Sequence, residues 1–266
     1  MSDTAGSLEG GSRESGSLGG VQSIRRATQI LTAIARRSPI GVGLSELSRR
    51  TNLAHPTVRR ILRCLIEEQL VVQDAGSKRY LLGPLVFEFG LCAPHQGALI
   101  RKARPSLERL CAATGDTIYL TARSGIDGVC LDRIEGTFPI RVITTGIGDR
   151  RPLGVGAVGL ALLSRLEESE ITTILRENRA EYARYGLDPK DLHAAIWASR
   201  QRGYGVSNGL LTPGVAGIGL CITSPRGAPI AGISIASVTD RIVGPRLDEL
   251  LALLRPEVAA ISDALA

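Results

Sequence analysis

Hydrophobic residues near the start of the chain recur at the spacing of an amphipathic helix. One face of the segment that starts at Val21 carries five of them: Ile24, Ala27, Ile30, Leu31 and Ile34. This period predicts a helix, which a cluster of Pro and Gly beginning at Pro39 should end. A shorter second helix is expected over residues 45–51, and a turn over residues 52–55 follows it.

The third predicted helix, residues 56–69, begins with Pro56, a position where the missing N–H of proline costs nothing. A core stripe with helical spacing runs along it: Val58, Ile61, Leu62, Leu65 and Ile66. The opposite face holds Arg60 and Arg63, with Arg59 and Thr57 on its flanks. Two short helices, a tight turn and a third helix with arginines opposite its core predict a helix-turn-helix.

A β-hairpin is expected directly after this helix. Apolar residues over 70–73 and 78–82 flank the turn Asp74-Ala75-Gly76-Ser77, whose residue types favour tight turns. Lys78 and Arg79 make the tip and the returning strand basic. A basic hairpin in this position is a wing, so the segment predicts a winged helix-turn-helix.

The remainder of the chain mixes strands and helices without regular alternation, which indicates an α+β domain. Strands are expected over residues 117–123, 128–134, 140–144, 218–223 and 230–237. Helices are expected over residues 85–91, 99–113, 157–165, 168–178, 188–201 and 244–265. The resulting domain plan is a disordered Gly/Ser-rich tail (1–20), a winged helix-turn-helix (21–83), a linker helix (84–98) and a larger domain (99–266).

Charge separates the two predicted domains. Residues 21–83 hold 11 Lys or Arg and 4 Asp or Glu, a net charge of +7, while the rest of the chain has 21 basic and 22 acidic residues, a net charge of −1. A basic segment of small-domain size is the footprint of a polyanion-binding module. An ordinary solvated basic surface would also carry such a charge, so the pattern gains weight only together with the predicted fold.

Several other classes of function are not favoured. The five cysteines are widely separated and odd in number, which favours reduced thiols over disulfides or a metal site. No segment approaches the ~18 apolar residues of a membrane helix, and no local spacing suggests a catalytic triad. We therefore expect a cytoplasmic protein that is not an enzyme, with no cofactor, no metal and no membrane partner.

The sequence resembles the IclR family of bacterial regulators over nearly the whole chain after the tail. The resemblance rests on several motifs in one order: residues 21–27, 56–62 and 79–83, Pro152 with the Gly/Ala segment 154–159, then 203–206 and 213–215. It implies a winged helix-turn-helix and a GAF-like effector-binding domain. It also implies a homodimer or homotetramer, double-stranded operator DNA as a partner, and control by small metabolites, often carboxylic or aromatic acids.

The resemblance also implies site residues. DNA contact is expected from seven residues of the turn, the third helix and the wing: His55, Thr57, Arg59, Arg60, Arg63, Lys78 and Arg79. The effector pocket should include six more: Ala157, Val158, Ser207, Gly217, Ser234 and Ala236. Ser207, Gly217 and Ala236 replace polar or reactive residues that many relatives carry, and a pocket poor in polar groups satisfies a buried carboxylate badly. We therefore expect an apolar or aromatic effector rather than a small keto acid.

Alternatives remain for several of these residues. The arginines of the third helix could form a solvated face paired with Glu67 and Glu68, Thr57 could be a simple helix cap, and the wing could be a solubilising edge. Gly154–Gly159 spells GxGxxG, which in a nucleotide-dependent enzyme follows a strand directly. We expect no strand there, and we expect these glycines to allow a helix start to approach a ligand or a sheet closely.

Overall fold

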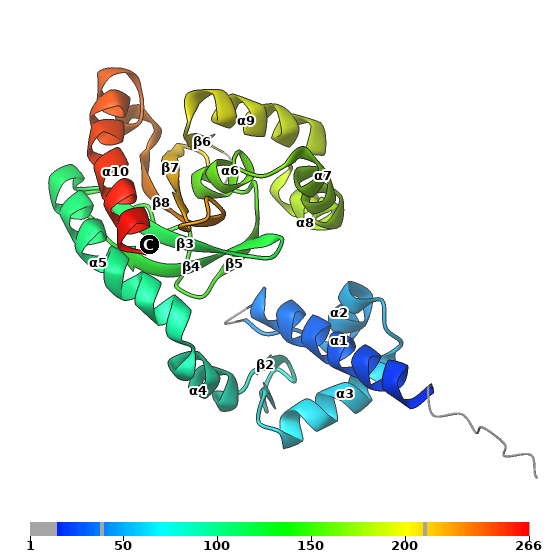
Figure 1. The fold of residues 1–266 in the computed structure, drawn as a ribbon. Coiled ribbons are helices and arrows are strands. Elements are labelled where there is room, and N and C mark those ends of the chain that lie inside the picture. The colour runs from blue at the N-terminus through cyan, green and yellow to red at the C-terminus, as the bar shows by residue number, and fades with distance from the viewer. Residues whose placement is uncertain (1–14, 38–39, 210–211, 266) are drawn as a thin grey trace, which may run out of the picture. The chain divides into compact units, whose positions relative to one another are not determined.

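The computed structural model describes residues 15–37, 40–209 and 212–265 (Figure 1). The chain divides into two compact units, one up to Gly90 and one from Leu91 on. Most of the predicted disordered tail, residues 1–14, lies outside the described residues. Helix α1 begins at Ser15 rather than at Val21, so the prediction of disorder up to Gly20 is wrong for its last six positions.

Three helices and a hairpin form the body of the N-terminal unit, and a fourth helix, α4, crosses its boundary at Gly90. Its elements are α1 (Ser15–Ala35), α2 (Leu44–Thr51), α3 (His55–Glu67), β1 (Val71–Gln73), β2 (Tyr80–Leu82) and α4 (Pro84–Cys92). Apolar faces of α1, α2 and α3 meet in one core that contains Ile30, Leu47 and Leu62. Strands β1 and β2 pair antiparallel, and Val42 adds a bridge to Tyr80. The predicted winged helix-turn-helix is therefore confirmed.

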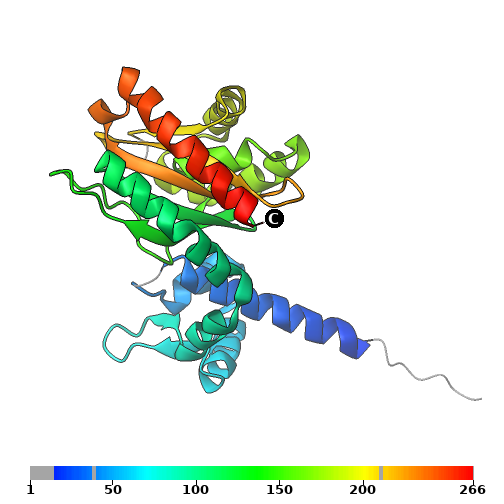
Figure 2. The ribbon, with the colours of Figure 1, turned by 60° about the vertical axis from the view of Figure 1, so that its left-hand side comes forward.

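The C-terminal unit has one six-stranded sheet, six α-helices and two short 3-10 helices among the described residues (Figure 2). Its strands are β3 (Thr117–Ser124), β4 (Asp127–Ile134), β5 (Arg150–Pro152), β6 (Gly205–Asn208), β7 (Val215–Thr223) and β8 (Pro229–Val238). Its helices are α5 (Pro94–Thr114), α6 (Ala157–Leu163), α7 (Glu168–Glu177), α8 (Arg179–Tyr182), α9 (Pro189–Arg202) and α10 (Gly244–Ala264). Helix α5 starts five residues before the predicted helix, inside the stretch expected to be a linker.

The sheet has the order β5-β4-β3-β8-β7-β6, and every neighbouring pair is antiparallel. Because successive side chains of a strand point to opposite faces, Ile118, Leu120 and Ala122 of β3 enter the core beneath α5 and α10. Tyr119 and Thr121 point to the other face. Helix α6 covers that second face together with α7, α8 and α9, which Figure 1 shows on the opposite side of the sheet from α5 and α10.

Helix α6 lies unusually close to the strands beneath it because glycines face it. A Cβ atom on Gly205 would lie 2.0 Å from the carbonyl oxygen of Ala157, and one on Gly219 would lie 2.8 Å from the backbone of the same turn. Gly159 allows the same closeness on the helix side, where a Cβ would meet the backbone of Gly154 at 2.7 Å. The first turn of α6 is therefore held against the sheet with no side chain between them.

The predicted strand over residues 140–144 is wrong: the segment has no regular structure. Its backbone groups bond to side chains instead of to a strand. The Tyr119 hydroxyl donates to the Val142 carbonyl at 2.7 Å and accepts from the Thr144 N–H at 3.2 Å. Arg133 donates to the Thr145 carbonyl at 2.9 Å. The apolar residues of this segment predicted a strand, but its backbone groups bond to the side chains of Tyr119 and Arg133 and do not pair with a neighbouring strand.

The glycine-rich segment 154–159 does follow a strand, so the expectation that no strand precedes it is wrong. Strand β5 ends at Pro152, and α6 begins at Ala157. However, β5 is an edge strand that pairs antiparallel with β4, and an edge position tolerates proline. A dinucleotide fingerprint requires a parallel βαβ unit, which this sheet lacks among its described strands. Of the described helices, none combines the length and apolarity needed to cross a membrane.

Candidate nucleic-acid interface and ligand pocket

The exposed face of α3 carries three arginines. Val58, Leu62 and Leu65 bury the opposite side of the helix. Arg59 and Arg60 are exposed and form no ion pair within the described part of the chain. Arg63 lies 3.8 Å from Glu67, but both side chains are well exposed, and such pairs contribute ~0–1 kcal/mol. The carboxylates that could have neutralised this face therefore compensate little of its charge.

His55 and Thr57 lie in the first turn of α3. His55 is the first residue of the helix and is exposed. Thr57 is half-buried, and its backbone N–H donates to the Ala54 carbonyl at 2.9 Å. That N–H is therefore already used, and only the Thr57 hydroxyl is left for a phosphate. Neither side chain caps the helix, because the N-cap residue is Ala54.

The two basic residues of the wing differ in their surroundings. Asp74 accepts from the N–H and the hydroxyl of Ser77 at 2.7 and 2.6 Å, which fixes the turn. Lys78 follows this turn in a left-handed conformation and is exposed. Arg79 is half-buried and donates to the Gly41 carbonyl at 3.0 Å. Lys78 is thus free at the tip, while Arg79 also connects the wing to the loop before α2.

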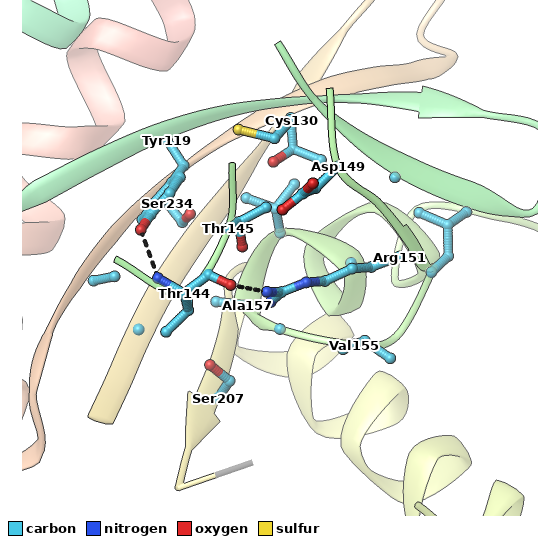
Figure 3. A pocket seen from close by; sticks show the side chains of 18 of the residues that line it. Tyr119, Cys130, Thr144, Thr145, Asp149, Arg151, Val155, Ala157, Ser207 and Ser234 are labelled. Atoms are coloured by element: carbon cyan, nitrogen blue, oxygen red, sulfur yellow. Dashed lines mark hydrogen bonds between the residues drawn. The ribbon is translucent and has the colours of Figure 1, made fainter. Parts of the chain in front are cut away.

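A cavity opens beside α6 in the C-terminal unit (Figure 3). Its volume is about 80 Å³, several times the ~10–15 Å³ that one water requires on the same measure. All six residues expected at the effector pocket line it: Ala157, Val158, Ser207, Gly217, Ser234 and Ala236. The structure therefore brings together residues that are up to 79 positions apart in the sequence.

The cavity is not poor in polar groups, so that expectation is wrong. A second wall, which the sequence analysis missed, adds Tyr119, Thr121, Cys130, Thr144, Thr145, Asp149 and Arg151. These residues reach the cavity only through the order of the sheet, which local patterns do not reveal. One signal was available: the alternation in β3 places Tyr119 and Thr121 opposite its buried apolar residues.

Hydrogen bonds fix the second wall around residue 144. Tyr119 approaches from β3 and holds the Thr144 N–H, while Arg151 approaches from β5 and donates to the Thr144 carbonyl (Figure 3). The hydroxyls of Ser207 and Ser234, which line the cavity, have no hydrogen-bond partner in the described parts of the chain. The cavity thus has one wall whose backbone is held by hydrogen bonds, and two serine hydroxyls that remain available to a ligand.

Asp149 and Arg151 are the two charged side chains that line the cavity. Burial raises the pKa of Tyr119, and it raises the pKa of the Cys130 thiol to about 11, so both groups are neutral at pH 7. Arg151 is half-buried and has no carboxylate partner within the described residues, in contrast to Arg150, which pairs with Asp127 at 3.2 Å. An unpaired guanidinium in a cavity is suited to an anionic group. The described residues contain no cluster of three potential metal ligands.

Comparison with known proteins gives consistent results for both units. The family profile described as the bacterial transcriptional regulator IclR C-terminal domain matches residues 93–263. The profile of the IclR helix-turn-helix domain matches residues 23–75. The HTH-type transcriptional regulator BhcR of Paracoccus denitrificans is 32% identical over 234 residues, which cover 87% of this chain and 83% of that protein.

Solved structures show the same fold. An IclR family transcriptional regulator from Brucella abortus matches with a TM-score of 0.77 and 23% identity, covering 97% of this chain and 98% of that one. An IclR homologue from Microbacterium hydrocarbonoxydans, solved in complex with 4-hydroxybenzoate, matches with a TM-score of 0.66 and 18% identity. It covers 91% of this chain and 98% of the other.

Proposed function

The chain belongs to the IclR family of bacterial transcriptional regulators, and we propose that it binds an operator as a homodimer through α3 and the wing. Proteins of this family combine a DNA-binding domain with an effector-binding C-terminal domain, and this chain has both. In the cytoplasm, where the chromosome lies, two α3 helices of a dimer would enter successive major grooves of a palindromic site.

The exposed, weakly compensated arginines of α3 carry this proposal. Arg59, Arg60 and Arg63 are exposed on the side of α3 away from its buried residues. One major groove of DNA can accommodate this side of the helix. Arginine pairs with phosphates and, in a bidentate manner, with guanine. Lys78 at the wing tip adds a contact to the backbone. The net charge of +7 on residues 21–83 supports the same surface.

A gel-shift titration against the DNA upstream of the protein's own gene tests this function. Arg60→Ala combined with Arg63→Ala should weaken specific binding by about 10- to 100-fold and reduce the salt slope by about 1–2. Arg226→Ala is the matched control, because Arg226 is an exposed arginine in the turn between β7 and β8. Equal effects of the two changes would contradict the assignment, as would the absence of specific binding to genome-selected fragments.

A second copy of the chain is the partner we propose for α4. This apolar helix has no buried residue, and Phe87, Phe89 and Leu91 are 69, 59 and 71% exposed. Contiguous apolar surface of this kind marks an interface. Sedimentation equilibrium should give a dimer or tetramer for the native chain and a smaller species for Phe87→Ser combined with Phe89→Ser. An unchanged mass would contradict this interface.

We also propose that the cavity beside α6 binds an effector with an acid group, which Arg151 receives. The polar second wall removes the argument for an apolar effector, and the unpaired guanidinium supports an anion. The 4-hydroxybenzoate bound by the Microbacterium homologue is an acid of this kind. The effector would change operator affinity by shifting the population of arrangements of the two units.

Operator binding with and without added acids tests the effector. A responsive acid should change the apparent affinity for operator DNA in the native protein and in Arg141→Gln, whose exposed arginine does not line the cavity. Arg151→Met should remove the response and leave binding without effector intact. A response that persists in Arg151→Met would contradict this role.

A further inference from the structure

Two charged side chains line the cavity at the start of β5. Asp149 is the last residue of the turn before the strand, and Arg151 is its second residue. Arg150, between them, points the other way and bonds to Ser124 and Asp127. Both Asp149 and Arg151 line the cavity, and Figure 3 shows both side chains at its wall.

These two charges do not neutralise each other. No ion pair joins Asp149 to Arg151 within the described residues, and the guanidinium donates to the Thr144 carbonyl. Asp149 Oδ2 accepts from the Gly146 N–H at 2.6 Å, while Oδ1 has no donor among the described residues. The cavity therefore offers a carboxylate oxygen that has no donor, beside a guanidinium that has no carboxylate partner, among the described residues.

We propose that Asp149 determines specificity: the cavity selects acids that also carry a hydrogen-bond donor, namely hydroxy or amino acids, over keto acids with the same carbon skeleton. This inference rests on the proposed effector function. Arg151 would receive the acid group, and Asp149 Oδ1 would accept from the hydroxyl or ammonium group of the ligand.

The discrimination follows from what a carboxylate can do. An ionised aspartate is only an acceptor, so a ketone oxygen opposite Oδ1 would place two acceptors together, whereas a hydroxyl at the same position donates. The other polar groups do not oppose this preference. The Tyr119 hydroxyl is already occupied by Val142 and Thr144, and serine hydroxyls both donate and accept. A mismatched buried polar group weakens binding by about tenfold or more.

A purely structural role for Asp149 makes a different prediction. Its Oδ2 closes the turn over residues 146–149, where the Asp149 N–H also donates to the Gly146 carbonyl at 3.1 Å. Asp149→Asn keeps an oxygen for this turn but places an NH₂ donor where Oδ1 lies. If Asp149 only holds the turn, the variant changes thermal stability and leaves ligand preference unchanged. If Asp149 meets the ligand, the preference is lost or reversed.

The experiment measures dissociation constants by isothermal titration calorimetry for matched pairs of acids. The pairs are glycolate and glyoxylate, lactate and pyruvate, and 3-hydroxybutyrate and acetoacetate. The native protein should bind the hydroxy member of at least one pair at least tenfold more tightly. Asp149→Asn should lose or reverse that preference, Arg151→Met should bind neither member, and Asp240→Asn, an exposed aspartate outside the cavity, should behave as the native protein does.

Each other result overturns the inference. Equal affinity within every pair, preference for the keto acids, no binding of any acid, or a preference that survives Asp149→Asn would each do so. A gel shift without ligand, performed on the same preparations, distinguishes failure of the selection by Asp149 from failure of the proposed DNA-binding function. Specific operator binding without the ligand preference removes only the selection by Asp149, while loss of operator binding with the preference intact removes only the DNA-binding proposal.

Discussion

Replacing Gly219 by alanine tests whether direct backbone contact holds α6 against the sheet. The added Cβ would lie 2.8 Å from Ala157 C and Val158 N, whereas ordinary contact begins at 3.4 Å. The first turn of α6 must therefore move by at least 0.6 Å, the difference between these distances. It cannot move freely, because its own backbone also lies against Gly205.

The expected cost follows from overpacking in a rigid place. Such insertions cost ~1–3 kcal/mol, and alanine recovers ~0.5–1 kcal/mol relative to glycine in a strand. Because only backbone opposes the new methyl group, we take the upper end and expect a net loss of about 2 kcal/mol. For a unit of this size, that loss lowers Tm by about 4–8 °C.

Gly217→Ala is the matched control, on the same strand and the same face two positions away. Its Cβ would meet Ile235 O at 3.3 Å and Ser207 Oγ at 3.5 Å, contacts that a small adjustment relieves. Differential scanning calorimetry should show a Tm within about 2 °C of the native value. Since Gly217 lines the cavity, this variant should change ligand affinity instead. Equal Tm shifts for the two variants would refute the argument that α6 is held through glycine.

Three further changes test other parts of the structure. Arg79→Ala removes a hydrogen bond to a loop carbonyl and should lower the unfolding free energy of the N-terminal unit by about 1 kcal/mol, whereas Lys78→Ala should not; urea unfolding compares them, and equal losses would contradict the bond's role. Arg241→Ala removes the nearest cation from the buried Asp116, which keeps the Ser237 hydroxyl at 2.6 Å and Arg246 at 3.8 Å. The change should cost about 2–3 kcal/mol in the same assay, and a loss below ~0.5 kcal/mol would argue against that pair. The Cys130 thiol, with its pKa raised to about 11 by burial, should resist iodoacetamide at pH 8 while exposed Cys64 reacts, and its labelling should rise only toward pH 11; peptide mass spectrometry reads both sites, and comparable labelling at pH 8 would count against the buried neutral thiol.

Helices with long apolar stripes were predictable from sequence because their period is local. The expected start of the third helix, Pro56, lies one residue from the observed start at His55, and the final helix was expected at Gly244, where α10 begins. Strands β5 and β6 were missed because three or four residues do not establish a period, whereas the equally short β1 and β2 were expected from the turn between them. The apolar residues around Val142 gave a false strand because the backbone there bonds to side chains.

The ligand cavity was predictable only in part, for a related reason. Residues near α6 and on the last strands were expected through family motifs, and the structure places them around one cavity. Tyr119 and Arg151 were missed because the sheet order β5-β4-β3-β8 brings them there. The alternation in β3 indicates which face Tyr119 takes, but no local pattern shows which strands lie beside it, so the polar wall and its charge required the structure.

The manner in which residues 142–145 are held has a consequence for how this protein can diverge. Strands keep their hydrogen bonds whatever side chains they carry, but here three side chains, from Tyr119, Arg133 and Arg151, hold the backbone. A substitution at any of these positions would remove one of the bonds that shape this wall of the cavity, while the backbone pairing of the strands does not depend on that side chain. With the effector role proposed for this cavity, duplicated copies of such a gene could acquire new chemical signals in small steps while the DNA-binding unit stays unchanged.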